Sequence, residues 1–162
     1  MKNILKYSII GMFLILTSCD KEKNSPDYTL DSESYKGFLF ENLKIVDIQN
    51  SSNLIPDFIV SVQISETGVV LSPFMSHPNL ENRFILSEEF ESSDSAQTYF
   101  DSYSIPENKP FQKFALNIKP NQIWLIKTNK GEYGKILVLK SKATNINNKP
   151  FAEMTFKAAR MK

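Results

Sequence analysis

Short segments in which apolar and polar residues alternate cover most of the chain and predict β-strands. Between residues 57 and 64, Phe, Val and Ile side chains alternate with Asp, Ser and Gln, which is the period of a half-buried strand. Similar short apolar segments predict strands within 38–40, 43–48, 69–71, 83–86, 111–118, 122–140 and 151–158. Residues 72–82 contain two prolines and are predicted to form a loop.

One segment has the spacing of a helix instead. Four residues fall at i, i+3, i+4 and i+7 and form one apolar face: Ala96, Tyr99, Phe100 and Tyr103. Asp94 with Gln97 three residues later predicts the N-terminal cap. We therefore expect an all-β or mostly β fold, with a single antiparallel β-rich domain and one short helix.

The segment 122–140 predicts a hairpin that turns at Asn129-Lys130-Gly131. With Gly131 at positive φ, opposite residue numbers in the two strands sum to 260. One face then holds four apolar residues, Trp124, Ile126, Ile136 and Val138. Gly134 lies opposite Ile126 and leaves room for the Trp124 indole or another backbone.

The second face of this hairpin is apolar far from the turn and amphipathic close to it. It carries Ile123, Leu125, Leu137 and Leu139, and near the turn Lys127, Tyr133 and Lys135. Lysine stems can cover apolar surface while their ammonium groups reach solvent. Lys127 and Lys135 are therefore either solvent-reaching surface lysines or the rim of a carboxylate-binding surface.

The N-terminus has the pattern of an export and anchoring signal. Lys2 and Lys6 precede the apolar segment 9–16, which is shorter than the roughly 20 residues that span a bilayer. Leu16-Thr17-Ser18-Cys19 resembles a bacterial lipobox, which implies that Cys19 is acylated, for example by palmitate. A buried structural cysteine is the alternative for Cys19, the only cysteine in the chain.

These features predict three parts of the chain. Residues 1–18 are a lipoprotein signal peptide, 19–34 a lipid-anchored tether, and 35–162 the β domain. Because Cys19 has no partner, the exported domain has no disulfide to stabilise it. We expect the N-terminal lipid to anchor the protein to the outer membrane and the domain to be exposed on the cell surface.

The near-neutral net charge conceals an uneven distribution. Residues 20–108 hold 16 acidic and 5 basic residues, whereas residues 109–162 hold 2 acidic and 12 basic residues. Such asymmetry indicates either pairing between neighbouring strands or a basic surface for an anionic partner. Nucleic acid is excluded as a partner because the basic residues are dispersed and the protein carries an export signal.

The hairpin also carries a family resemblance. The string Ile126-Lys127-Thr128-Asn129-Lys130-Gly131-Glu132-Tyr133-Gly134-Lys135-Ile136 resembles a recurrent hairpin of the HmuY-like family of Bacteroidetes lipoproteins. The family pattern is approximately I-K-T-x-x-G-x-Y-x-K-I/L followed by a final strand, here residues 151–156. The resemblance implies a lipid-anchored, cell-surface protein that binds haem, takes it from host haemoproteins, and holds the iron between two axial side chains.

This chain departs from that pattern because it has a single histidine, His77, and a His/His site is excluded. The remaining haem-ligand candidates are Met75, His77 and Met154, with Lys127 and Lys135 as contacts for the propionates. Met75 and His77 are too close in sequence to clamp opposite faces of one porphyrin, so a distant partner such as Met154 would be needed. Alternatively, His77 is an ordinary exposed histidine and Met154 a core residue.

Catalytic arrangements lack parts in this sequence. With one histidine and one lipid-bound cysteine, neither a Ser/His/Asp triad nor a zinc site can be assembled, and we expect no enzymatic activity. Asp94-Ser95-Ala96 resembles the O-glycosylation sequon of Bacteroidetes, which makes Ser95 a candidate for modification, with helix capping as the alternative role for this segment. The sequence leaves two functions open: haem or porphyrin capture for iron acquisition, and a non-catalytic surface scaffold or adhesin-like lipoprotein of the same fold.

Overall fold

The structure is a computed structural model and describes residues 26–49, 54–104 and 109–161. Its elements are β1 Asp27–Asp31, β2 Lys36–Leu39, β3 Lys44–Asp47, β4 Phe58–Ile64, β5 Val70–Ser76, β6 Phe84–Glu89, α1 Ser93–Ser102, β7 Phe114–Ala115, β8 Gln122–Lys127, β9 Tyr133–Ile146 and β10 Lys149–Met161. The expected mostly β fold with one short helix is confirmed.

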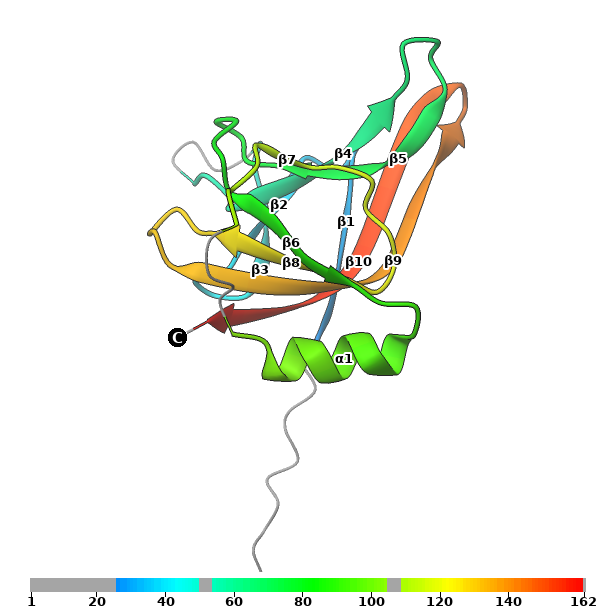
Figure 1. The fold of residues 1–162 in the computed structure, drawn as a ribbon. Coiled ribbons are helices and arrows are strands. Elements are labelled where there is room, and N and C mark those ends of the chain that lie inside the picture. The colour runs from blue at the N-terminus through cyan, green and yellow to red at the C-terminus, as the bar shows by residue number, and fades with distance from the viewer. Residues whose placement is uncertain (1–25, 50–53, 105–108, 162) are drawn as a thin grey trace, which may run out of the picture.

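The strands form two antiparallel five-stranded sheets that pack face to face (Figure 1). The first sheet has the order β1-β10-β9-β8-β6, and the second has the order β3-β2-β4-β5-β7. The main core lies between them and is rich in aromatic rings. Phe38 packs edge-on against Phe40 and Phe156, with ring centroids 5.2 Å apart in both pairs, an arrangement that aromatic pairs prefer.

The predicted hairpin register is confirmed. β8 and β9 pair from Ile123 opposite Leu137 to Lys127 opposite Tyr133, so every pair sums to 260. The face that carries Trp124 lies in the core between the sheets. An added Cβ at Gly134 would lie 2.2 Å from the Phe40 ring, so the space that this glycine leaves is occupied by Phe40 and not by Trp124 or another backbone.

The loop predicted for residues 72–82 is wrong over its first part, because β5 runs from Val70 to Ser76. Pro73 is tolerated in this strand because of its position. Its carbonyl accepts a hydrogen bond from the Ile118 N–H at 3.4 Å, on the side away from β4. The missing N–H of Pro73 therefore faces the sheet edge, where the two-residue strand β7 pairs only with Met75 and Ser76.

The helix α1 covers the outer face of the first sheet. Ala96 and Phe100 are buried against Ile123 and Leu137 of the hairpin, as the apolar spacing predicted. The predicted cap Asp94 is wrong, because Ser92 is the N-cap and its Oγ accepts a hydrogen bond from the Ser95 N–H at 3.2 Å. The N-cap of α1 therefore lies two residues before Asp94.

The β domain includes residues before residue 35. Residues 27–31, which we expected in the tether, form β1 and pair with β10 from Asp27 opposite Lys157 to Asp31 opposite Glu153. Leu30 is fully buried in the main core. The tether predicted for 19–34 is therefore too long at its C-terminal end, because Tyr28 and Leu30 supply apolar surface that the core buries. Among the described residues, no helix is long and apolar enough to cross a membrane.

Candidate functional site

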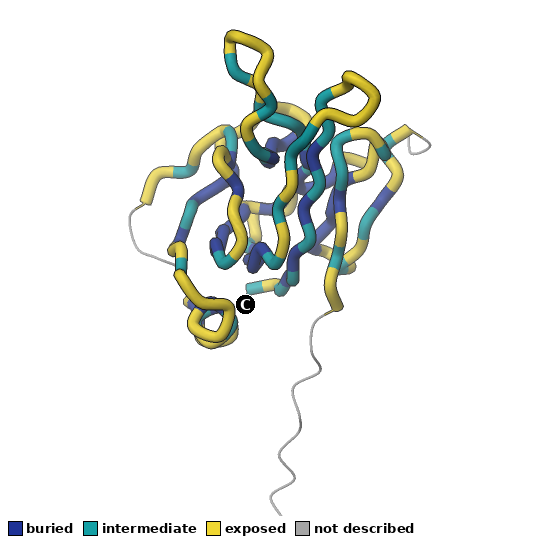
Figure 2. The backbone as a smooth tube through the Cα atoms, turned by 90° about the vertical axis from the view of Figure 1, so that its right-hand side faces the viewer, coloured by how far each residue is buried: buried dark blue, intermediate teal, exposed yellow. Residues whose placement is uncertain are grey.

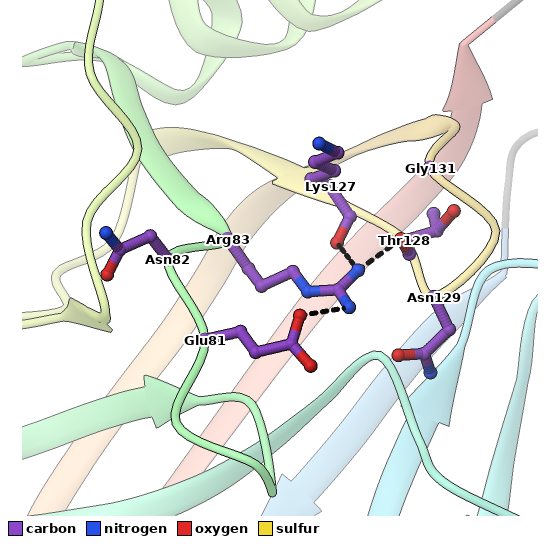
Figure 3. Close-up of a pocket in the computed structure, with 7 residues that line it drawn as sticks. All are labelled: Glu81, Asn82, Arg83, Lys127, Thr128, Asn129 and Gly131. Atoms are coloured by element: carbon purple, nitrogen blue, oxygen red, sulfur yellow. Dashed lines mark hydrogen bonds and ion pairs between the residues drawn. The ribbon is translucent and has the colours of Figure 1, made fainter.

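Three segments far apart in sequence meet at the turn between β8 and β9. They are residues 54–57 before β4, residues 77–83 between β5 and β6, and the turn 128–132 itself. Two adjoining cavities of about 530 Å³ and 460 Å³ lie here and share the lining residues Glu81, Arg83, Thr128 and Asn129. We call these two cavities the turn groove; Figure 3 draws the first of them.

Arg83 fixes the backbone of the turn from one side. One guanidinium nitrogen donates to the carbonyl oxygens of Lys127, at 3.1 Å, and of Thr128, and the other donates to Glu81 Oε2 at 2.6 Å (Figure 3). The side chain of Arg83 is buried, whereas that of Glu81 is 48% exposed. The hydrogen bond from Arg83 holds the pKa of the Glu81 carboxyl below its ordinary value.

Asp57 fixes the same turn from the opposite side. Its buried carboxylate accepts hydrogen bonds from the backbone N–H of Asn129 at 2.7 Å and of Phe40 at 2.8 Å. One carboxylate therefore ties the β8–β9 turn to the end of β2. Backbone N–H donors satisfy a buried carboxylate well, because charge-assisted hydrogen bonds offset the loss of its hydration.

His77 completes this attachment and is fully buried. Its Nδ1 accepts a hydrogen bond from the Asn79 backbone N–H at 3.2 Å, and its Nε2 lies 2.8 Å from Asn129 Oδ1. Since Nδ1 is an acceptor, the proton belongs on Nε2, which donates to Asn129. The Asn129 amide in turn donates to the Ile55 carbonyl at 2.8 Å.

The arrangement gives the groove rigid polar walls with mostly compensated charge. Glu81 pairs with Arg83, and Glu41 pairs with Lys130 at 2.6 Å; the latter contact lowers the pKa of the Glu41 carboxyl. Lys127, by contrast, is exposed and its ammonium group extends away from the Arg83–Glu81 pair (Figure 3). Within the described ranges, no hydrogen-bond or ion-pair partner is found for that ammonium group, which leaves one uncompensated positive charge at the rim.

The structure separates the three haem-ligand candidates from solvent. Met75 on β5 and Met154 on β10 are fully buried in the main core between the sheets. His77 is not the exposed loop histidine that we considered, and both of its ring nitrogens have hydrogen-bond partners. None of these three side chains lines the turn groove.

The two lysine candidates have different surroundings. Lys127 lines the turn groove. Lys135 is buried beneath α1, where its Nζ donates to the carbonyl oxygen of Phe100 and lies 3.4 Å from that of Tyr103. The prediction of a solvent-reaching or anion-binding Lys135 is therefore wrong, because the end of the helix takes up its charge.

The remaining candidates lie at the surface or outside the described residues. Ser95 is exposed in the first turn of α1, and its Oγ accepts a hydrogen bond from Ser92 Oγ at 2.9 Å. Its glycosylation stays a prediction. Cys19 lies outside the described residues.

Sequence reasoning missed the groups that build the groove, namely Asp57, Arg83 and Asn129. One signal was present: Arg83 is the single basic residue between Lys44 and Lys109. A lone arginine in an acidic stretch indicates a specific contact, since a guanidinium group can donate to several carbonyl or carboxylate oxygens at once. The pairing with the turn carbonyls depends on tertiary structure and has no local signature.

Among the described residues, no cluster of three or more His, Cys, Asp or Glu side chains is arranged to hold a metal ion. No protein-family model matches the chain, and no match is found among curated proteins or solved structures. The class that can be stated is therefore a two-sheet antiparallel β-sandwich with a polar groove at one turn.

Proposed function

We propose that the protein is a non-catalytic, lipid-anchored binding protein of the outer membrane, a surface scaffold or adhesin-like lipoprotein whose turn groove contacts its ligand. The observation that carries this proposal is the attachment of the β8–β9 turn by Asp57 from the segment before β4 and by His77 and Arg83 from the segment between β5 and β6. A groove whose walls are already ordered loses little conformational entropy on binding. That property suits recognition of a ligand by a fixed polar surface.

The roles of the charged groups support binding over catalysis. A general base or nucleophile needs a free electron pair directed at a substrate. The His77 imidazole uses both nitrogens in hydrogen bonds, and Asp57 uses both carboxylate oxygens for backbone N–H groups. These side chains hold the groove together.

The chemistry of the groove favours a polar ligand with an anionic group. Lys127 provides an uncompensated positive charge, and Asn82 and Asn129 add amide groups to the lining.

An array of glycans and peptides, divided into carboxylate-bearing and neutral members, tests whether the turn groove prefers an anionic ligand. We expect the purified full chain to bind carboxylate-bearing members and Lys127→Glu to lose them, while the control Lys36→Glu, at an exposed position on β2, keeps them. Equal binding by Lys127→Glu and the unaltered protein would reject the groove as the contact surface.

Haem capture is the second candidate, and exposed Lys127 is the observation that favours it, since a lysine at a rim can meet a propionate. Titration of the purified full chain with hemin, followed by the Soret band in oxidised and reduced states, separates the two candidates. The proposed scaffold function predicts no saturable spectral change. A saturable shift that is lost in His77→Ala, Met75→Ala or Met154→Ala would instead establish haem binding and identify the ligand.

Lipid anchoring is tested by growing cells with labelled palmitate. We expect label on the unaltered chain and none on Cys19→Ala, which should then leave the membrane fraction. Digestion of intact cells with a protease tests display on the surface, because only an outward-facing domain is cleaved without breaking the cells. Label on Cys19→Ala would contradict the proposed anchor.

A further inference from the structure

Two strands extend past their neighbours on the same side of the sandwich. β9 pairs with β8 only as far as Leu137, although it continues to Ile146. β5 likewise pairs with β7 only at Met75 and Ser76. The β4–β5 and β9–β10 hairpins carry these ends, and their tips stand apart at the top of the molecule (Figures 1 and 2).

The backbone of β9 directs hydrogen-bonding groups to this open side. Ala152 on β10 exchanges two hydrogen bonds with Ser32, accepting from its N–H at 2.9 Å and donating to its Oγ at 3.0 Å. The backbone of Ala152 therefore faces away from β9, and its partner Ala143 belongs to a pair without ladder hydrogen bonds. The N–H and C=O of Ala143 consequently point to the open side of β9.

The backbone N–H and C=O groups of Asn145, two residues further along β9, also point to the open side. Asn145 pairs with Pro150, which has no N–H to donate to β9, so this pair also fits a position without ladder hydrogen bonds. Within the part of the chain that the structure describes, no strand pairs with residues 140–146 on the side opposite β10. We call residues 140–146 the β9 edge. Unpaired strand edges are templates for the addition of another strand.

A cavity of about 370 Å³ lies beside the β9 edge, between β9 and β5. Its apolar lining is Leu71, Pro73, Ile118 and Ala143, with Ser72 and Ser141 among the polar lining residues. Leu71 is 51% exposed. The facing edge of β5 cannot accept a strand in the same way, because Pro73 lacks a donor and its carbonyl already accepts from Ile118.

The outer face of the β9 edge is basic. Lys140 and Lys142 are exposed and alternate with Ser141 and Ala143, so their side chains point to the face opposite the cavity. Glu153 lies across from Lys142 on β10, but no ion pair joins them among the described residues. A strand placed beside β9 would bring its own outward side chains next to these two lysines.

We propose that the β9 edge binds an extended segment of a partner protein by strand addition. Apolar side chains of that segment enter the cavity beside Leu71 and Ile118, and the alternating carboxylates lie opposite Lys140 and Lys142. Main-chain hydrogen bonds to Ala143 and Asn145 supply affinity, and the alternate side chains supply specificity. This surface shares no lining residue with the turn groove.

A second copy of this chain is a poor occupant. Pairing of two β9 edges about a two-fold axis would place Lys140 and Lys142 of one copy near the same lysines of the other. Like charges opposite each other destabilise a strand pair, and edge lysines are a known device against self-association. The charge pattern therefore selects a partner with acidic side chains.

The test uses the purified full chain and a fluorescent seven-residue peptide in which Glu and Val alternate, with a Lys–Val peptide as its charge-reversed control. We expect saturable binding of the Glu–Val peptide by fluorescence anisotropy and weaker binding of the Lys–Val peptide. Ala143→Pro removes the outward N–H while sparing the ladder to β10, and should weaken binding by about fivefold or more, the effect of losing a backbone hydrogen bond. Thermal unfolding checks that this variant folds.

A second pair of variants does not depend on proline. Lys140→Glu with Lys142→Glu should weaken the Glu–Val peptide and strengthen the Lys–Val peptide, whereas Lys36→Glu on the other sheet should change neither. Absence of peptide binding, or binding that all these variants leave intact, overturns the proposal. A dimer of the unaltered chain that Ala143→Pro converts to a monomer would also overturn it, because the edge would then serve a second copy.

Discussion

At the scale of single residues, Lys135 and Lys127 show how one added element changes the role of a side chain. Both lysines lie on the same face of the hairpin, but α1 covers only the position of Lys135. Its ammonium group lies at the C-terminal end of the helix and 4.9 Å from the centre of the Phe100 ring. The negative end of the helix dipole and the aromatic face both favour a cation there.

This contact predicts a measurable contribution to stability. Lys135→Met keeps most of the apolar stem but removes the charged donor, and should lower the free energy of unfolding by about 1.5–3 kcal/mol, the range for hydrogen bonds to charged groups. Lys140→Met, at an exposed position, should stay within about 0.5 kcal/mol. Urea unfolding compares the two, and equal stability of both variants would contradict the role of Lys135.

The pair of Glu81 and Arg83 predicts a dependence on pH. The hydrogen bond from Arg83 depresses the pKa of Glu81 in the folded state, so its contribution is present above the unfolded pKa of about 4.3. It is lost as the pH falls through the folded pKa. Glu81→Gln should therefore be less stable than the unaltered chain at pH 7, and the difference should vanish in acid. Urea unfolding from pH 7 to 3 follows it, with exposed Glu66→Gln as control; a difference independent of pH would argue against the pair.

The candidate site could be predicted from the sequence only where strand alternation decides the outcome. Lys127 follows from the hairpin register, which fixes its face and its distance from the turn. The buried state of His77 does not follow, because Asn79 and Asn129 surround it only after the loop 77–83 has folded against the turn. Long-range polar contacts have no period that a sequence pattern can reveal.

At the scale of elements, the start of α1 shows that residue type alone does not identify a helix cap. Asp94 and Ser92 both belong to residue types that cap helices, and the apolar spacing from Ala96 onward does not distinguish them. The backbone does: Ser92 has the extended dihedral angles of a cap, with φ −116° and ψ 146°. Asp94 lies inside the first turn, where its charge is favourable for another reason, the positive end of the helix dipole.

The cap position predicts unequal effects of two substitutions. Ser92→Ala should cost about 1 kcal/mol because it removes the acceptor of the Ser95 N–H. Asp94→Asn should cost only about 0.3–1 kcal/mol, since it loses the interaction with the helix dipole but leaves the cap intact. Thermal and urea unfolding of both variants provide the comparison. A larger loss for Asp94→Asn than for Ser92→Ala would restore Asp94 as the cap.

Strands with regular alternation were predicted well, and β5 was not. Proline at 73 indicated a loop because it cannot donate to a ladder, yet the position is acceptable where β7 ends. Whether a proline fits at position 73 depends on the length of the neighbouring strand β7, which is a property of the whole sheet. The same inequality of strand lengths produces the open β9 edge, which local patterns do not reveal.

At the scale of the whole molecule, the division of charge along the chain is partly resolved by pairing between its two halves. Lys119 contacts Glu89 at 3.3 Å, and Lys130 contacts Glu41 at 2.6 Å. Each pair joins an acidic residue of the first half to a basic residue of the second. Surface pairs of this kind contribute little stability individually, but they place opposite charges from the two halves of the chain side by side.

The pairing of β1 with β10 predicts where the domain can be shortened. A chain that begins at Asp27 should be as stable as the full chain. A chain that begins at Tyr35 loses Leu30 from the core, which alone is worth about 1.5–3 kcal/mol, together with the Tyr28 ring that packs 4.8 Å from Phe38. Urea unfolding of both chains tests the boundary, and similar stability of the shorter one would show that β1 is dispensable.

The position of β1 beside β10 also constrains the order of folding. Thr29 and Thr155 share a side-chain hydrogen bond of 3.1 Å although 126 residues separate them. Contacts of such long range require the chain to close a large loop first, and proteins dominated by them fold slowly. The first sheet cannot be completed on a growing polypeptide until its last strand has been synthesised. The domain therefore reaches its final form only after β10 has been made and can pair with β1.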